Sequence, residues 1–468
     1  MSGDIAFLTA TELLALYASK KLSSVEATNA ALNQIRRHNG AVNAFCLVDE
    51  ERAFAAAKAS EGRWMRNEPL GLLDGVPCSV KDLLVTKGWP SLRGSRMIAR
   101  DQAWEENAPS VDRLLESGAV LLGKTTTPEF GWKGVTDSPL TGLTRNPWDL
   151  SKTPGGSSGG AAVAAALGMG ALHIGTDGGG SIRIPASFTG IFGLKPTHGR
   201  VPAYPPSPFA EVAHIGPMTR AVEDAALMLQ IMAQPDRRDW QALTTAPPDY
   251  RSGLKDGVQG LRIGYSRDLG FAEVDPEVER LVLEGCAIFK SMGSRISPIN
   301  LDLSASGEAF RAYWCAGLSH LVSKLDPDLR DAVDPALLKA AEFGASFPLS
   351  EYLGLMAERA PIRHKLSTVF ADFDLLVTPA TPIPAFAAGQ ECPTAGDWDW
   401  TSWTPFTYPF NLSQQPAAVV CCGRTFAGLP AALQIVGPRL ADALVLRAAY
   451  ALQQAIPFDA PPMALEGE

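Results

Sequence analysis

The sequence predicts an α/β protein built on a large, mixed and twisted β-sheet with layers of helices on both faces. Of the 468 residues, 46% are apolar and 19% charged, as in ordinary globular proteins. From about residue 70, short β-rich runs such as GVPCSV and AVLLG alternate with helical segments such as SVDRLLES and GGAAVAAALGMG. This alternation is typical of a sheet covered by helices.

The N-terminal part, to about residue 65, is predicted to be mostly helical. Thr9 precedes Glu12 and Ser23 precedes Glu26, each ahead of an apolar run with helical spacing. A hydroxyl followed three residues later by a glutamate is typical of a capping box at a helix start. We therefore expect helices to begin at both places.

Further elements follow a polar, proline-bearing stretch, residues 235–260, which is typical of a surface connection. After it, LRIGYS indicates a strand, VERLVLEGCAIFKSMG an amphipathic helix and DLLVTPA a buried strand.

Charge and composition narrow the function to small-molecule chemistry. A net charge of -9 without a basic run argues against nucleic acid or an anionic membrane as a partner. Asp4 and Glu12 interrupt the start where a signal peptide needs an apolar stretch, and the apolar run Ala161 to Gly175 is too short for a membrane helix. The seven cysteines lack CxxC spacing. We expect a cytoplasmic protein with reduced thiols.

Two motifs match known patterns out of context. GAVLLGKT, residues 118–125, fits the phosphate-binding pattern GxxxxGK[ST], but its middle predicts a buried strand, so Lys124 is interpreted as an ordinary strand-end lysine. GGSSGG, residues 155–160, fits the nucleophile elbow GxSxG, but the preceding SKTP is no strand and no histidine follows His364. One of the two serines could instead cap the following helix.

Three other stretches point to hydrolytic chemistry when they are taken together. They are GVPCSVKDL with Lys81, TPGGSSGG with Ser157 and Ser158, and GTDGGGSIRIP with Ser181. In this order and spacing the chain closely resembles the amidase signature family of serine hydrolases. The resemblance continues through SFTGIFGLKPTHGRV and HIGPMTR, and returns in DLLVTPATPIP and GLPAALQIVGP.

The resemblance implies a single amidase domain over residues 1–468. Its parts would be N-terminal helices (about 1–65), the signature core (about 66–220), a divergent substrate-shaping region (about 235–370) and a C-terminal return to the core (about 371–468). It also implies an acyl-enzyme mechanism without a cofactor, acting on a small-molecule amide. Ester or carbamate hydrolysis would be side activities.

The resemblance assigns the catalytic roles to a lysine and two serines. Ser181 would be the nucleophile, Ser157 a bridging serine held by a cis peptide bond, and Lys81 the base. A basic Lys81 must be neutral, so its pKa must fall from about 10.4 towards 7, a change of about 4 to 5 kcal/mol that burial can supply. We therefore predict a buried Lys81 amine hydrogen-bonded to Ser157.

The triple glycine resembles the family's oxyanion hole, formed by backbone N–H groups of Gly178, Gly179, Gly180 and Ser181. Many members carry a larger residue at the first of these positions, so Gly178 predicts a looser loop. A flexible linker is the alternative, and the strand-like flanks argue against it. Ser158 would support the site. Asp177 and Arg183 are expected to pair and brace the loop.

Histidines near the motifs are not needed by this chemistry. His173 lies in the apolar run ALHIG and is interpreted as a core histidine. No HExxH or other metal-ligand spacing occurs, so no metal is expected.

The substrate is less well determined than the reaction. The stretch DWDWTSWTPFTYPF could line an apolar pocket for an aryl or acyl group. Its candidate pocket residues are Trp398, Trp400, Trp403, Phe406 and Tyr408. The alternative function is the amidase subunit of a glutamine-dependent tRNA amidotransferase, which acts with partner subunits; NLSQQPAAVVCCG departs from the family pattern and argues against a close assignment. The intact lysine and serines argue against an inactive binding protein. The sequence leaves a homodimer open.

Overall fold

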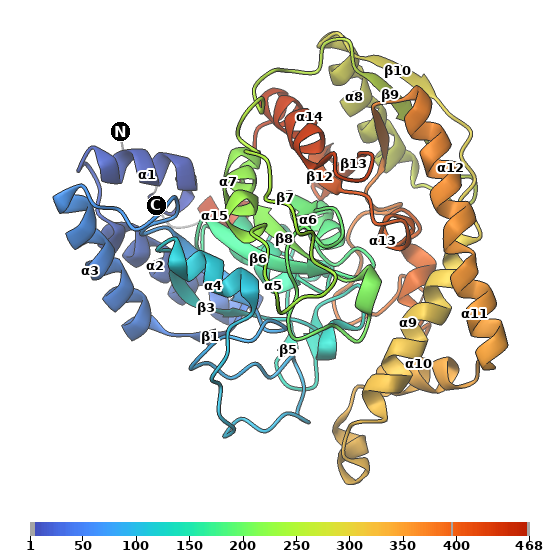
Figure 1. Cartoon of the computed structure of the whole chain (residues 1–468), viewed down its shortest axis with the longest axis horizontal. Coiled ribbons are helices and arrows are strands. Elements are labelled where there is room, and N and C mark those ends of the chain that lie inside the picture. Colours follow the sequence, from blue (N-terminus) through green and yellow to red (C-terminus); the bar gives the residue numbers. More distant parts are fainter. Residues whose placement is uncertain (1–4, 395, 466–468) are drawn as a thin grey trace.

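One sheet of eleven strands runs through the computed structural model, which describes residues 5–394 and 396–465 (Figure 1). In sheet order the strands are β1 (Phe45–Val48), β3 (Val120–Thr125), β2 (Pro77–Lys81), β6 (Leu172–Asp177), β8 (His214–Thr219), β7 (Phe192–Lys195), β12 (Ala417–Arg424), β13 (Pro430–Val436), β11 (Leu375–Pro379), β9 (Arg262–Tyr265) and β10 (Arg295–Pro298). β4 (Asp137–Ser138) and β5 (Gly142–Leu143) form a separate pair. Strands β3, β2 and β6 are parallel, whereas β6 through β11 pair antiparallel. The predicted mixed sheet is confirmed.

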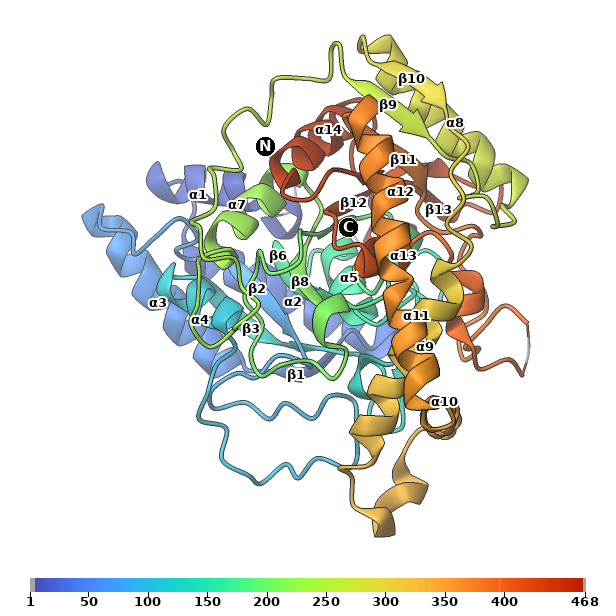
Figure 2. The same cartoon turned by 45° about the vertical axis from the view of Figure 1, so that its right-hand side comes forward.

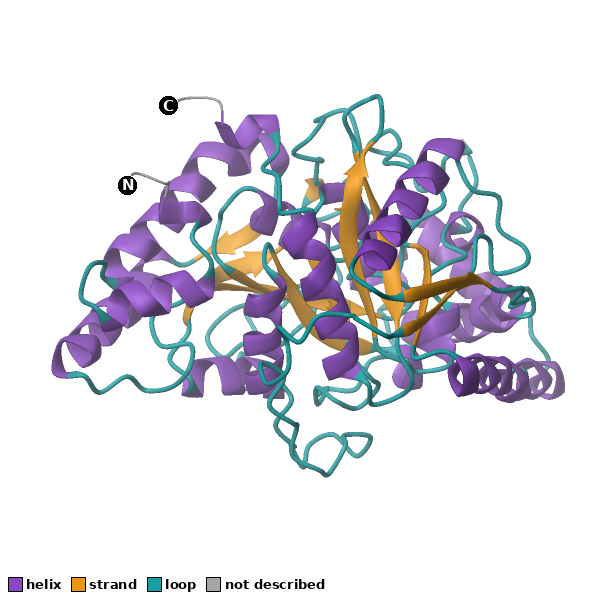
Figure 3. Cartoon of the chain, turned by 90° about the horizontal axis from the view of Figure 1, so that it is seen from above, coloured by secondary structure: helices purple, strands orange, loops and turns teal. Residues whose placement is uncertain are grey.

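Helices cover both faces of this sheet (Figure 3). The helices are α1 (Ala10–Ala18), α2 (Ser24–Val42), α3 (Glu50–Arg66), α4 (Pro109–Glu116), α5 (Gly159–Ala166), α6 (Arg183–Thr189), α7 (Val222–Met232), α8 (Pro276–Ser291), α9 (Ser306–Val322), α10 (Pro335–Ala345), α11 (Leu349–Ala357), α12 (Arg359–Asp372), α13 (Pro409–Leu412), α14 (Asp442–Ala455) and α15 (Pro462–Leu465). Short 3-10 helices are η1 (Ile5–Phe7), η2 (Glu129–Gly131), η3 (Ala210–Val212), η4 (Pro327–Ala332) and η5 (Trp400–Trp403).

The strands alternate between two apolar cores because successive side chains point to opposite faces. In β11, Leu375 and Val377 pack with α7, α8 and α14, whereas Leu376 packs with α9, α10 and α12. The burial of both faces explains why the strand sequences are almost wholly apolar.

Both predicted capping boxes are confirmed. The Glu12 N–H donates to Thr9 Oγ1 at 3.1 Å and the Thr9 N–H donates to the Glu12 carboxylate at 2.8 Å. Ser23 and Glu26 make the same pair of bonds at the start of α2. Strand β1, which pairs antiparallel with β3, interrupts the helices between α2 and α3 and was not predicted.

Helices α9 to α12 lie along one side of the molecule (yellow to orange in Figure 2). Residues 235–260 contain no helix or strand, as predicted, and Trp240 within them is 82% exposed. Within the described ranges, no helix combines the length and the apolar character needed to cross a membrane.

Candidate active site

The lysine and the serines meet where β2 and β6 end. These strands are parallel neighbours, with Val80 opposite Ile174, so their carboxyl ends lie at one edge of the sheet. Lys81 ends β2, Ser157 lies in the turn before α5, and Ser181 lies in the turn from β6 to α6. Lys81 Nζ lies 2.7 Å from Ser157 Oγ. The predicted buried amine bonded to Ser157 is confirmed, and the Gly156–Ser157 peptide bond is cis, as the resemblance implied.

The Lys81 amine is held by hydroxyl groups alone. Besides Ser157, it contacts Ser158 Oγ at 2.8 Å and Thr176 Oγ1 at 2.9 Å. Burial lowers the pKa of Lys81 well below its ordinary value, and the charge of Asp177 only partly opposes this effect. The amine is therefore neutral near pH 7, as a general base must be.

Ser158 orients this amine. Its hydroxyl donates to the Thr176 carbonyl at 3.1 Å, so it accepts a hydrogen from Lys81. A neutral amine then keeps a lone pair for the proton of Ser157. Ser158 stands at the N-cap position of α5, but its side chain makes no capping bond, and neither does that of Ser157 within the described residues. The expectation of a capping serine is thus wrong, because Lys81 and Thr176 occupy the Ser158 hydroxyl.

Packing explains the triple glycine. A Cβ on Gly178 would lie 2.7 Å from the Trp314 ring, and one on Gly179 would lie 2.5 Å from the Phe310 ring. Gly180 has a φ of 132°, in the region that favours glycine. The expected looser loop is wrong, because aromatic rings fill the space of the missing side chains.

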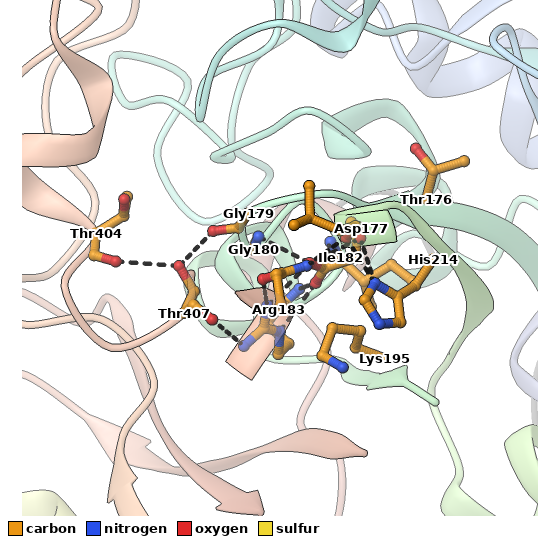
Figure 4. Close-up of polar contacts among 12 residues, drawn as sticks. Thr176, Asp177, Gly179, Gly180, Ile182, Arg183, Lys195, His214, Thr404 and Thr407 are labelled. Carbon is orange, nitrogen blue, oxygen red and sulfur yellow. Dashed lines mark hydrogen bonds and ion pairs between the residues drawn. The ribbon is translucent and has the colours of Figure 1, made fainter. Parts of the chain in front are cut away.

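One predicted oxyanion donor is already occupied. The Gly180 N–H donates to Asp177 Oδ1 at 2.8 Å (Figure 4). Gly180 is therefore corrected from a donor to a residue that closes the turn. The N–H groups of Gly178, Gly179 and Ser181 make no hydrogen bond to other described residues.

Asp177 and Arg183 pair as predicted. Arg183 Nε and Nη2 each lie 2.9 Å from an Asp177 carboxylate oxygen (Figure 4). Arg183 also donates to the Thr407 carbonyl, Gln434 Oε1 and Asn411 Oδ1. Burial alone would raise the pKa of Asp177, but the Arg183 guanidinium outweighs burial and holds that pKa below its usual range. This fully buried pair ties the glycine loop to the C-terminal segment.

His173 is a core residue, as predicted. It is fully buried, with Nδ1 2.7 Å from Ser79 Oγ, and burial lowers its pKa to about 3. Lys124 requires a correction. It does lie at the end of β3, but it is fully buried and forms an ion pair with Asp82 at 3.2 Å. The sheet covers its side chain, so a solvated lysine was the wrong expectation.

A cavity of about 110 Å³ opens onto Ser157 and Ser181. Its walls are mainly apolar and come from the loop after β2, from η2, from residues 203–215 and from α9. The apolar lining includes Leu83, Leu84, Phe130, Phe209, Ile215, Trp314 and Leu321. Trp314 stacks on Phe209 with ring centroids 3.5 Å apart.

The five aromatic residues proposed from the sequence do not line this cavity. Trp400, Trp403, Phe406 and Tyr408 are buried, and Trp398 packs partly buried against the same core. Trp400 contacts Phe310 and Trp314 edge to face, so these residues lie behind the glycine loop. In this cavity the sequence reasoning missed Trp314, Phe209 and Arg93; only the run YPPSPF, residues 204–209, carried a signal of an unusual wall.

Comparison with known proteins places the chain in a family. The family model described as Amidase matches residues 26–446. An acylamidase of Rhodococcus erythropolis is 36% identical and a glutamyl-tRNA(Gln) amidotransferase subunit of Moorella thermoacetica 37% identical, each over 97% of this chain and 97% and 98% of the relative. The crystal structure of a bacterial aryl acylamidase of the amidase signature family superposes with a TM-score of 0.91 at 30% identity, over 100% of both chains. The chain thus belongs to the amidase signature family and is an amide hydrolase.

Proposed function

We propose that this protein hydrolyses the carbon–nitrogen bond of a small, apolar or aryl-containing amide through an acyl-enzyme on Ser181. The observation that carries the proposal is the buried Lys81 amine, 2.7 Å from Ser157 in the wall of the cavity that Ser181 also lines. The apolar lining supports the substrate class, because such walls bind apolar and aromatic groups.

In the first half-reaction, Lys81 takes the Ser157 proton while Ser157 takes the proton of Ser181. Ser181 Oγ bonds to the amide carbon, and the N–H groups of Gly178, Gly179 and Ser181 donate to the resulting oxyanion. When the carbon–nitrogen bond breaks, the proton returns through Ser157 to the departing amine. Water then repeats the sequence and releases the acid from Ser181.

The relay needs Ser181 to move within reach of Ser157. Among the described residues, the Ser181 hydroxyl makes no hydrogen bond to Ser157. Catalytic hydrogen bonds are often long without substrate and shorten in the complex. An ester or a carbamate presents the same carbonyl carbon, so we propose hydrolysis of both as side activities.

A second candidate is the amidase subunit of a glutamine-dependent amidotransferase. It is favoured by the 37% identity to the Moorella thermoacetica protein over nearly the whole chain. In that role, the protein would act on glutamine and would assemble with partner subunits. As an independent amidase, we propose a cytoplasmic enzyme and a homodimer, which the mass from light scattering distinguishes from a monomer.

Hydrolysis of neutral aryl amides against glutamine tests the two candidates. We expect the protein alone to hydrolyse 4-nitroacetanilide and Ser181→Ala to lose at least 1000-fold in kcat/KM. Ser252→Ala, an exposed serine in the 235–260 connection, is the matched control and should retain the rate. Turnover of glutamine in place of every anilide would favour the amidotransferase role, and an active Ser181→Ala would contradict both.

A further inference from the structure

Arg93 lines the same cavity as the two serines and plays no part in the proposed reaction. We propose that Arg93 binds a carboxylate of the substrate, so that the preferred substrates are amides that also carry a carboxylate. This inference rests on the proposed function and adds an anionic group to the apolar substrate class.

The backbone holds Arg93 firmly in an unusual conformation. Its φ is 54°, in the left-handed region that favours glycine, although arginine has a Cβ. Its carbonyl accepts the Phe130 N–H at 2.7 Å, and its own N–H is hydrogen-bonded to Asp82. Non-glycine residues held in this region cluster at active sites and ligand clamps. The chain thus fixes the direction in which the Arg93 side chain leaves the loop.

The guanidinium of Arg93 has no partner within the protein. Among residues 5–394 and 396–465, no side chain or carbonyl accepts a hydrogen bond from it, and its Nε is buried. Asp82 acts on it electrostatically, but the Asp82 carboxylate is already paired with Lys124 at 3.2 Å. A buried cation without hydrogen bonds is costly, so a ligand that supplies acceptors would be bound strongly.

The charges around the cavity leave Arg93 uncompensated. Of the other acidic and basic residues that line it, Asp177 is paired with Arg183, and burial lowers the pKa of His214 well below its ordinary value. Lys81 beside the cavity is neutral by the argument above. The cavity therefore carries one positive charge, and a single carboxylate complements both this charge and the planar fork of arginine.

The position of Arg93 fits a substrate that spans the cavity. Arg93 is bonded to Phe130, next to Gly131, whose added Cβ would lie 3.3 Å from Ser157 Oγ. Trp314 packs against Gly178, on the glycine-loop side of Ser181. An apolar or aryl group against Trp314 and a carboxylate at Arg93 would place the amide between them, at the nucleophile.

Two pairs of anilides test the inference. In each pair a ketone replaces the carboxylate: 4-acetamidobenzoate with 4-acetamidoacetophenone, and succinyl-4-nitroanilide with levulinyl-4-nitroanilide. The wild type should prefer the carboxylate in at least one pair by tenfold or more in kcat/KM. Arg93→Met should reduce that preference at least tenfold, and Arg93→Lys should retain part of it.

Arg96→Met is the matched control, since Arg96 is an exposed arginine of the same loop outside the cavity lining. It should retain the wild-type preference, and the rate of fluorophosphonate labelling of Ser181 reports that each variant is folded. Equal preference in the wild type and Arg93→Met would overturn the inference.

Failure of the proposed function gives a different result, the hydrolysis of none of the four anilides. Their protection of Ser181 against fluorophosphonate then decides the role of Arg93. Protection by the carboxylates that is stronger than by the ketones and lost in Arg93→Met supports it, and equal protection overturns it.

Discussion

At the scale of single residues, the site depends on a lysine that burial keeps neutral. Lys81 contacts three hydroxyl groups and no carboxylate among the described residues. Because its folded pKa is depressed, Lys81 is protonated only when the pH falls below that pKa, well under its ordinary value of 10.5. The base is present above the depressed pKa and is lost below it.

We therefore expect kcat/KM to rise with pH through the depressed pKa of Lys81 and then to level off. Lys81→Arg, which stays charged, should lose at least 1000-fold at every pH because it cannot accept the Ser157 proton. Steady-state rates from pH 5 to 10 measure both effects. A Lys81→Arg enzyme with the wild-type profile would show that another group is the base.

The Asp177–Arg183 pair should be far more important for stability than exposed ion pairs. Arg183→Met leaves the fully buried Asp177 without its partner and should lower the free energy of unfolding by about 3 to 5 kcal/mol. The control is Arg424→Met, because Arg424 and Asp459 form a pair that is 50% and 60% exposed, which contributes about 0 to 1 kcal/mol. Urea unfolding compares the variants, and equal losses would contradict the bracing role.

At the scale of elements, the glycine loop and α9 fit together as one unit. Gly178→Ala would place a methyl group 2.7 Å from the Trp314 ring. Such overpacking should destabilise the protein by about 1 to 3 kcal/mol. Trp314→Leu in the same chain should recover part of that loss, because it removes the ring, and a double-mutant cycle by urea unfolding measures the coupling.

Gly354→Ala is the matched control for this prediction. Gly354 lies in α11, and a Cβ there meets nothing within 4 Å. Alanine should stabilise that helix by up to about 1 kcal/mol. A Gly178→Ala protein as stable as Gly354→Ala, or a cycle without coupling, would contradict the packing account.

The individual elements were largely predictable, because local periodicity and capping residues specify them. The helices after Thr9 and Ser23 and the strands around Lys81 and Val377 form where the sequence predicted. Strand β1 was missed because its four residues are too few to show a period. The burial of Lys124 and the filling of the loop by Trp314 depend on contacts between distant segments, which no local pattern reveals.

At the scale of the whole molecule, the sheet order joins segments that are far apart in the sequence. β12 and β13 lie between β7 and β11, so the C-terminal segment completes the centre of the sheet. The motifs identified the serines, the lysine and the glycine loop because the chemistry demands those residue types. The cavity wall was not identifiable in the same way, since Arg93, Phe209 and Trp314 come from three separate segments.

Buried groups also determine how the stability of the whole protein depends on pH. The folded pKa of His173 is about 3 and its ordinary value 6.5, so its contribution to stability is complete above pH 6.5 and is lost as the pH falls towards 3. Between pH 7 and 5 that loss is about 2 kcal/mol.

His173→Gln should therefore lose about 2 kcal/mol less than the wild type on going from pH 7 to pH 5. Asp224, whose buried carboxyl has a pKa raised to about 6, acts in the opposite direction, but it is common to both proteins and cancels. Urea unfolding at the two pH values measures the difference. Identical pH dependence in the two proteins would contradict a neutral, buried His173.

The most direct test of the central claim is to label the protein with a fluorophosphonate and map the modified peptide by mass spectrometry. The account predicts one adduct, on Ser181, which is absent from Ser181→Ala and forms more slowly in Ser157→Ala and Lys81→Ala. An adduct on Ser158, or labelling that persists in Ser181→Ala, would contradict the assignment of Ser181 as the nucleophile.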